Sequence, residues 1–231
     1  MILTPIPLAE LPGLSDAFAQ ALADHPLALA VFARIAATTA FVRGDTIALS
    51  TDSDHHAAAL ALVRSFGMGV IDGPPAKGFT WDGQAVAADM EPSVLIHEIG
   101  HFQACAPERR HVIDFGLGAG PETGLRGEAE AVASLGGVAG DLEEAFASLL
   151  GILWEAEVGQ PAILAFLEQN WLAGGATAAN RAHFLKIVEA LAAHGFLSPE
   201  GRPTRALREV DDQTFLGPLL VAPPQGAPKA C

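Results

Sequence analysis

Basic residues are scarce in this sequence, and tyrosine is absent. The 231 residues contain 13 Lys and Arg against 27 Asp and Glu, which gives a formal net charge of −14. A chain this acidic lacks the positive surface that nucleic acid requires, and an anionic membrane would repel it. We therefore expect no direct binding to nucleic acid and no binding to a membrane.

Cysteine and long apolar runs are also scarce. Cys105 and Cys231 are too few for a disulfide framework. Charged residues or histidine interrupt each apolar run before it reaches the length of a bilayer span. The first residues lack the basic start of a signal peptide and contain Pro5 and Pro7. These absences make a cytoplasmic location the default expectation.

Apolar residues are abundant, because half of the chain is hydrophobic and only 17% is charged. This composition suits a globular protein with a sizeable core. The patterns along the chain predict an α+β fold, predominantly helical with a small β-sheet. We expect an N-terminal helical and strand extension at 1–77, a metal-binding catalytic domain at 78–216 and a Pro-rich, irregular tail at 217–231.

Apolar periodicity and capping residues locate the individual elements. The sequence predicts helices at 15–37, 54–66, 93–105, 142–158, 162–173 and 177–194, with Pro26 as a candidate break in the first and Asp52 with Ser53 as the cap of the second. It predicts strands at 41–50 and 80–88. The loop Gly73–Gly78 (GPPAKG) is the candidate domain boundary.

The helix predicted at 93–105 carries the chemistry, because it contains His97, Glu98 and His101 in an H-E-x-x-H motif. Positions i and i+4 lie on one face of a helix, so both imidazoles can bind one ion while Glu98 stands beside the open coordination position. Two neutral imidazoles suit zinc and iron alike. The motif therefore predicts a transition-metal site without naming the metal.

The alternative is a surface helix that carries these residues by chance. Apolar residues surround the motif, so this helix should be buried, and buried imidazoles are costly unless they are paired or metal-bound. Gly100 inside the helix costs roughly 1 kcal/mol relative to Ala. That cost is easier to understand where another backbone approaches closely, so we favour the metal site.

A third protein ligand is needed, and four carboxylates compete for this role. Glu128 and Glu130 follow a Gly-rich loop, whereas Glu143 and Glu144 begin the helix predicted at 142–158. Glu144 precedes apolar residues at helical spacing, and we expect it to point inward. We therefore favour Glu144 over Glu130; the others would be solvated helix starts, where carboxylates favour the helix dipole.

The remaining histidines and the cysteine near the motif are weaker candidates. The group Asp54-His55-His56 could bind a metal, but its position in the first turn of a helix favours a solvated cap. Cys105 is expected to be a small buried hydrophobe. The isolated histidines are expected to be structural or exposed: His111, His183 and His194.

A basic pair, Arg109 and Arg110, follows the motif helix and precedes Asp114. Two arginines in this position could clamp a carboxylate or a phosphate of a substrate. They could equally pair with Asp114 and Glu144 inside the protein. The sequence pattern does not separate these two interpretations.

The combined pattern resembles the bacterial elongation factor P hydroxylase family. It consists of HEIGHF at 97–102, then Glu108-Arg109-Arg110, then Asp114-Phe115-Gly116, at the same offsets as in that family. The similarity extends over roughly Gly78 to Arg208 and includes Glu144 and Gly159-Gln160-Pro161. The resemblance implies a zincin-like fold and a non-haem, Fe(II)-dependent hydroxylase of a lysine-derived side chain on elongation factor P or a related protein.

The resemblance also implies roles for individual residues. His97, His101 and Glu144 would bind the metal, and Glu98 would be a neighbouring acid/base group. Three further residues would orient ligands or substrate: Arg109, Arg110 and Asp114. The alternative is a zinc metallopeptidase, the commonest context of H-E-x-x-H, in which Zn(II) polarises the scissile carbonyl and Glu98 is the general base.

Overall fold

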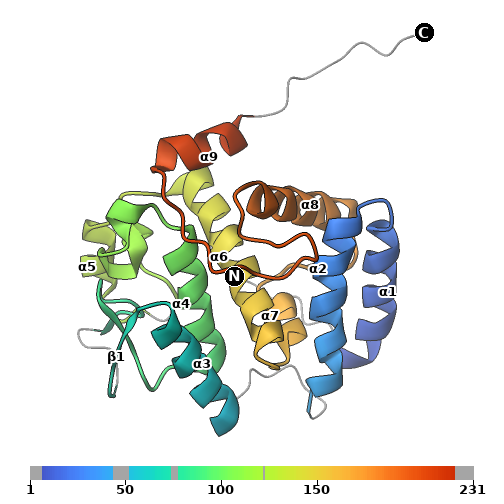
Figure 1. Ribbon diagram of the computed structural model, residues 1–231, viewed down its shortest axis with the longest axis horizontal. Helices are drawn as coiled ribbons and strands as arrows, with labels where there is room; N and C mark the ends of the chain where they lie inside the picture. The colour runs from blue at the N-terminus through green and yellow to red at the C-terminus, as the bar shows by residue number, and fades with distance from the viewer. Residues whose placement is uncertain (1–6, 44–51, 74–77, 122, 222–231) are drawn as a thin grey trace.

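The computed structural model describes residues 7–43, 52–73, 78–121 and 123–221. These residues form a predominantly helical fold with a small two-stranded parallel sheet (Figure 1). The predicted α+β class, mostly helical with a small sheet, is confirmed. No helix in the described part of the chain is long and apolar enough to span a bilayer.

The elements follow one another as a series of helices with one short sheet. The helices are η1 (Leu8–Glu10), α1 (Leu11–Ala21), α2 (Pro26–Ala37), η2 (Thr38–Phe41), α3 (Ser53–Ser65), α4 (Pro92–Ala104), η4 (Pro107–Arg109), η5 (Ile113–Gly116), α5 (Arg126–Ala131), α6 (Gly137–Glu157), α7 (Ala162–Glu168), α8 (Ala178–Ala193) and α9 (Asp212–Leu220). Strands β1 (Gly69–Ile71) and β2 (Ala85–Ala87) pair in parallel, with Gly69 opposite Ala85.

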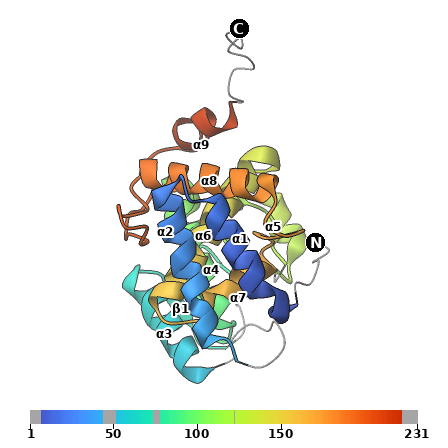
Figure 2. The same ribbon diagram turned by 90° about the vertical axis from the view of Figure 1, so that its right-hand side faces the viewer.

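Helix α6 lies between two hydrophobic cores (Figures 1 and 2). The larger core joins α6 to α1, α2, α7 and α8, and its centre is a group of phenylalanine rings packed edge to face. The smaller core joins α3, α4 and β2, and it includes Trp81, Phe115 and Trp154. Buried on both sides, α6 is a rigid support for any side chain that it carries.

Both cores contain residues from before and after Gly78. Phe18 and Phe32 of the predicted N-terminal extension contact Phe166 of α7. Strand β1 pairs with β2 across the predicted boundary loop, of which residues 74–77 lie outside the described part of the chain. The described residues of the extension thus share their cores with the part that carries the H-E-x-x-H motif.

Most predicted helices are present, with different ends. The break at Pro26 is confirmed, because α1 ends at Ala21 and α2 begins at Pro26. The predicted start of α6 at Leu142 is wrong: the helix begins five residues earlier at Gly137, whose φ of +57° lets the chain turn into the helix. Helix α7 ends at Glu168 rather than Ala173, because the chain turns at Asn170 with φ +64°.

The predicted strands are shorter than expected. Of residues 80–88 only Ala85–Ala87 form a strand, because Gly83 (φ +95°) turns the chain so that Trp81 bridges to Val86. Of residues 41–50, Phe41 ends η2, and 44–50 lie outside the described residues. The prediction of an irregular tail at 217–231 is wrong for its first residues, because 217–220 belong to α9. Residues 222–231 of the predicted tail lie outside the described part of the chain.

Candidate metal centre

Helices α4 and α6 approach each other closely at two glycines. A Cβ atom at Gly100 of α4 would lie 2.8 Å from the carbonyl carbon of Ala147, and one at Gly151 of α6 would lie 3.1 Å from the Cα atom of His97. Because position 100 faces 147 and position 97 faces 151, the two helices are antiparallel. The close backbone approach predicted at Gly100 is confirmed.

This approach brings Glu144 of α6 to the two histidines of α4. The Nε2 atoms of His97 and His101 are 3.0 Å apart. Oε1 of Glu144 lies 3.1 Å from His97 Nε2, and Oε2 lies 3.3 Å from His101 Nε2. Among the described residues, these form the one group of three metal-ligating side chains with ligand atoms within 4.8 Å of one another.

The donor spacing fits one shared ion. Two donors about 2.1 Å from an ion lie about 3.0 Å apart at a right angle and about 3.4 Å apart at a tetrahedral angle. The separations of 3.0, 3.1 and 3.3 Å fall within this range. Two imidazoles and a carboxylate are also a donor set that zinc and non-haem iron both accept.

The three other candidate carboxylates lie elsewhere. Glu143 is fully buried and pairs with Arg109 and Arg208. Glu128 and Glu130 are exposed on α5, where Glu130 accepts a hydrogen bond of 3.2 Å from the amide of Ala119. The structure therefore brings Glu144, and not these residues, to the histidines.

Glu144 lies at the open side of the site. Its side chain is 55% exposed, so the expectation that it points inward is wrong; Glu143 occupies the inward position. A small open pocket reaches Glu144 and is lined by Leu117, Gly136, Gly137, Gly140, Asp141 and Glu144. The side chain of His101, in contrast, is only 8% exposed. The centre thus has a closed side at His101 and an open side at Glu144.

The electrostatics couple the histidines to Glu144. Burial opposes protonation of His101, but the charge and hydrogen bond of Glu144, together with the charges of Glu98 and Glu143, outweigh it and raise the pKa of His101 to about 9. The positive charges of His101 and His97, with the hydrogen bonds of both rings to the carboxylate, hold the pKa of Glu144 well below the usual value. A metal ion binds imidazole in its neutral form, so metal binding here should release protons.

Glu98 is buried on α4 directly after His97. Burial raises the pKa of this carboxyl group, and the charges of His101 and His97 act in the opposite direction. A carboxyl group with a raised pKa beside a metal centre can exchange a proton with a bound reactant. Both functional hypotheses from the sequence give Glu98 a role of this kind, as an acid/base group or as a general base.

Phe115 orients the ring of His101 by stacking. Its ring lies 5.5 Å from that of His101 at an interplanar angle of 22°, and 5.3 Å from that of Trp81 at 2°. The Nδ1 atoms of His97 and His101 are buried without a hydrogen-bond partner in the described structure. A metal-binding histidine is usually oriented by a hydrogen bond at its second ring nitrogen. At His101 the stacked ring of Phe115 orients the imidazole instead.

The loop that carries Phe115 has an unusual backbone. Asp114, Phe115 and Gly116 have φ values of +44°, +53° and +70°, a region that costs non-glycine residues of order 1–3 kcal/mol each. The Asp114 carboxylate stabilises this turn by accepting hydrogen bonds from the hydroxyl groups of Thr80 (3.1 Å) and Thr123 (2.7 Å). Asp114 thus supports the loop that carries the stacked ring of Phe115.

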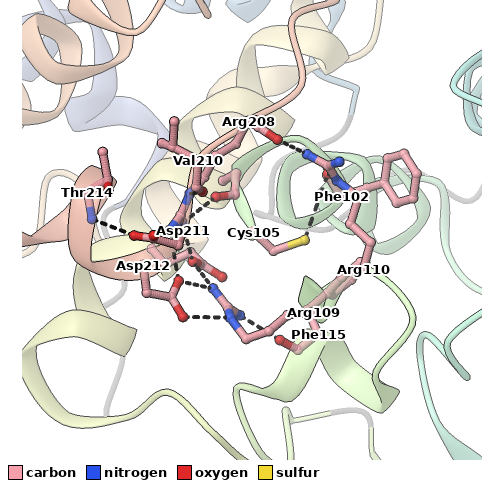
Figure 3. A network of polar contacts seen from close by, with 12 residues as sticks. Phe102, Cys105, Arg109, Arg110, Phe115, Arg208, Val210, Asp211, Asp212 and Thr214 are labelled. Atoms are coloured by element: carbon pink, nitrogen blue, oxygen red, sulfur yellow. Dashed lines mark hydrogen bonds and ion pairs between the residues drawn. The ribbon is translucent and has the colours of Figure 1, made fainter. Parts of the chain in front are cut away.

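Both arginines of the basic pair are engaged inside the protein (Figure 3). Arg109 donates hydrogen bonds to Glu143, to Asp212 at 2.9 and 3.1 Å, and to the carbonyl oxygen of Phe115 at 2.6 Å. Arg110 donates to the carbonyl oxygens of Phe102 (3.1 Å) and Arg208. Within the described structure, neither guanidinium pairs with Asp114 or Glu144, the partners considered from the sequence.

The weaker candidates do not belong to the group of His97, His101 and Glu144. Asp52 caps α3 by accepting hydrogen bonds from the amides of Asp54 and His55, as predicted for this segment. Cys105 is buried, as expected, and burial raises the pKa of its thiol to about 12. Three further histidines are exposed: His111, His183 and His194.

Comparisons with known proteins do not identify a relative. No protein-family model, no curated protein sequence and no solved structure matches this chain. The resemblance to the elongation factor P hydroxylases therefore rests on the motif residues themselves.

Proposed function

We propose that this protein is a metal-dependent enzyme whose ion is held by His97, His101 and Glu144. The observation that carries the proposal is the spacing of 3.0–3.3 Å among two imidazole nitrogens and one carboxylate supplied by two helices. We further propose that the fold is zincin-like, with the H-E-x-x-H helix α4 packed on the helix that supplies the third ligand. An open two-histidine, one-carboxylate centre is typical of catalytic rather than purely structural metal sites.

The activity that we propose is hydroxylation of a lysine-derived side chain on elongation factor P or a related protein, as the motif resemblance implies. A bound Fe(II) ion would supply the activation of O2, and three protein donors leave further coordination positions open for it. A substrate of this kind would place the protein in the cytoplasm, in agreement with the expectation from the sequence.

The protein's own residues support this chemistry in separate ways. Glu144 lines the open pocket, and we propose that a substrate side chain enters from this side. Glu98 exchanges a proton from the buried side, and the stacked ring of Phe115 holds His101 in place. Arg109 and Asp114 act through the loop of Phe115, because both are bonded within the protein rather than directed at the pocket.

The second candidate function is a zinc metallopeptidase. It is favoured by Glu98, a buried carboxyl group that makes no hydrogen bond to another described residue and has a raised pKa. Such a group beside the metal is suited to take a proton from the attacking water. The hydroxylase remains our first proposal because of the downstream arginine pair and Asp114-Phe115-Gly116.

Metal analysis of the protein purified without added metal separates the two functions. The hydroxylase predicts bound iron, and oxygen consumption when a reductant and elongation factor P carrying a lysine-derived modification are added. The product would gain the mass of one oxygen atom. Stoichiometric zinc together with peptide cleavage that Glu98→Gln abolishes would establish the peptidase instead.

A further inference from the structure

Glu143, the residue before the proposed ligand Glu144, is the centre of a buried ionic network. Its carboxylate is fully buried, and one oxygen, Oε2, accepts hydrogen bonds from Arg109 and, at 3.0 Å, from Arg208. Asp212 pairs with the same two arginines at 2.9 and 2.8 Å. Figure 3 shows Arg109, Arg208 and Asp212 of this network at the start of α9. Two negative and two positive charges balance within it.

Arg208 belongs to a segment, residues 204–212, that we call the C-terminal strap. The strap lies across the end of α4, where the amide of Gln103 donates to the carbonyl oxygens of Thr204 (2.9 Å) and Ala206 (2.8 Å). The backbone amide of Arg208 donates to the carbonyl oxygen of Gln103 at 3.0 Å, and its guanidinium donates to that of Ala104 at 2.9 Å. The strap therefore connects the metal helix α4 to Glu143 of α6.

We propose that Glu143 is a positioning residue for Glu144 and that the C-terminal strap thereby completes the metal centre. This inference rests on the proposed metal binding by His97, His101 and Glu144. Consecutive residues of a helix point about 100° apart. Any rotation of α6 about its axis that displaces Glu143 therefore displaces Glu144 by the same angle.

Helix α6 is held at two places, by its glycine contacts with α4 and by the ion pairs of Glu143. The contacts at Gly100 and Gly151 set how far α6 lies from α4. They limit the rotation of α6 at their own level, at positions 147 and 151, about one and two turns beyond Glu143. Glu143 restricts that rotation, because a buried carboxylate between two arginines has no other favourable position.

Glu144 itself has little else to hold it. Its side chain is half exposed, and within the described structure its ion pairs are with His97 and His101 alone. Ligands that are not oriented by outer contacts bind metal more weakly, and loss of such contacts typically reduces metal affinity by about 10–100-fold. Glu143, the preceding residue of the helix, is therefore the group that fixes the position of Glu144.

The test is Co(II) binding by the double variant Glu143→Gln/Arg208→Gln in the full-length protein. Removing one charge of each sign leaves the Arg109–Asp212 pair intact, so no buried charge is left unpaired. We expect the variant to fold, with the dissociation constant for Co(II) raised about tenfold or more. We also expect altered visible absorption bands of bound Co(II), because the carboxylate no longer meets the ion.

The matched control is Glu157→Gln/Arg202→Gln. This double variant removes the ion pair of Glu157 with Arg202, and with it the pair of Glu157 with Arg34, at the other end of α6. It is expected to bind Co(II) with the affinity and the absorption bands of the wild type. A merely structural role of Glu143 would lower the unfolding temperature and leave the bands of the folded, loaded protein unchanged.

The outcomes separate this inference from the proposed function. Wild-type affinity and bands in the folded Glu143→Gln/Arg208→Gln variant would overturn the inference while metal binding stands. Failure of the wild type to bind Co(II) at all would overturn both. If the double variant does not fold, Arg208→Lys provides the test. Lysine keeps the charge but cannot reach Glu143, Asp212 and Ala104 together, and unchanged affinity and bands in that variant would also overturn the inference.

Discussion

Gly100 of α4 lies directly against the backbone of Ala147 of α6, with no space between them for a side chain. This contact sets the separation of the two helices. The distance from Glu144 to the two histidines therefore depends on a residue that has no functional group of its own.

The substitution Gly100→Ala should accordingly damage both stability and metal binding. Its Cβ atom would overlap the Ala147 carbonyl group, and overpacking of this kind typically costs about 1–3 kcal/mol. Urea unfolding would measure the loss, and competition with a chelator would show weaker metal binding. The control is Gly127→Ala in α5, where nothing lies within 4 Å; it should stabilise the protein by up to about 1 kcal/mol. Wild-type stability of Gly100→Ala would contradict this account of the helix contact.

Removal of Glu144 should abolish tight metal binding. In Glu144→Ala two of three protein donors remain, so we expect metal affinity to fall by more than the roughly 100-fold upper range of outer-contact substitutions. The matched variant Glu130→Ala removes an exposed carboxylate that accepts a hydrogen bond from Ala119, and it should retain the metal. Metal content after dialysis against a weak chelator measures both. Loss of metal from Glu130→Ala with retention in Glu144→Ala would move the third ligand to α5.

The sequence predicted the features that lie within one helix. The H-E-x-x-H spacing, the break at Pro26 and the cap at Asp52 each depend on neighbouring residues, and the structure contains all three. The choice between Glu143 and Glu144 depends on the rotation of α6 about its axis, which neighbouring residues in the sequence do not determine. Glu144 meets the histidines from an exposed position rather than from the inward face on which it was expected.

The ionic network lay beyond sequence reasoning. Arg208 meets Glu143 across 65 positions of the chain, and Asp212 meets Arg109 across 103. No local motif marks contacts of this length, because only the packing of α9 and the strap brings them together. The sequence pattern therefore allows two roles for the arginine pair and does not indicate Glu143 or Asp212 as its partners.

Asp114→Asn should lower stability and change metal binding much less than Glu144→Ala does. Asparagine tolerates the left-handed backbone at this position, but it provides one carbonyl oxygen where the carboxylate accepts hydrogen bonds on both of its oxygens, from Thr80 and Thr123. Loss of a buried acceptor costs about 1–3 kcal/mol.

Urea unfolding of Asp114→Asn can be compared with that of Asp82→Asn. Asp82 also accepts two hydrogen bonds, from the amides of Gln84 and Ala85, but in a more exposed loop. We expect Asp82→Asn to lose less stability than Asp114→Asn. If Asp114→Asn released the metal while its unfolding curve matched that of the wild type, Asp114 would act at the centre rather than through the loop.

Glu155 should make the stability of the protein depend on pH. Burial raises the pKa of this carboxyl group to about 8, with a smaller contribution from the charge of Glu168. An acid with a raised pKa in the folded state contributes stability that is complete below its unfolded value, near 4.5, and is lost as the pH rises through 8. The wild type should thus lose stability, of order several kcal/mol, between pH 5 and pH 8.

The variant Glu155→Gln should remove most of this dependence. It should resemble the wild type at pH 5 and unfold at a higher urea concentration than the wild type at pH 8.5. Glu189→Gln, at an exposed position of α8, is the matched control and should follow the wild-type curve at both pH values. Parallel curves for Glu155→Gln and the wild type would show that Glu155 is not the group responsible.

The two sides of the pocket differ in how much they can change. One side is formed by residues of α6, which is held against α4 backbone to backbone, whereas the other is formed by Leu117 and Gly136, at the two ends of the connection that contains α5. Insertions or substitutions in that connection would alter which molecules reach the ion without moving any donor atom. In the proposed enzyme, changes in this connection alone could admit other substrates, while the helix contact keeps the donor atoms in place.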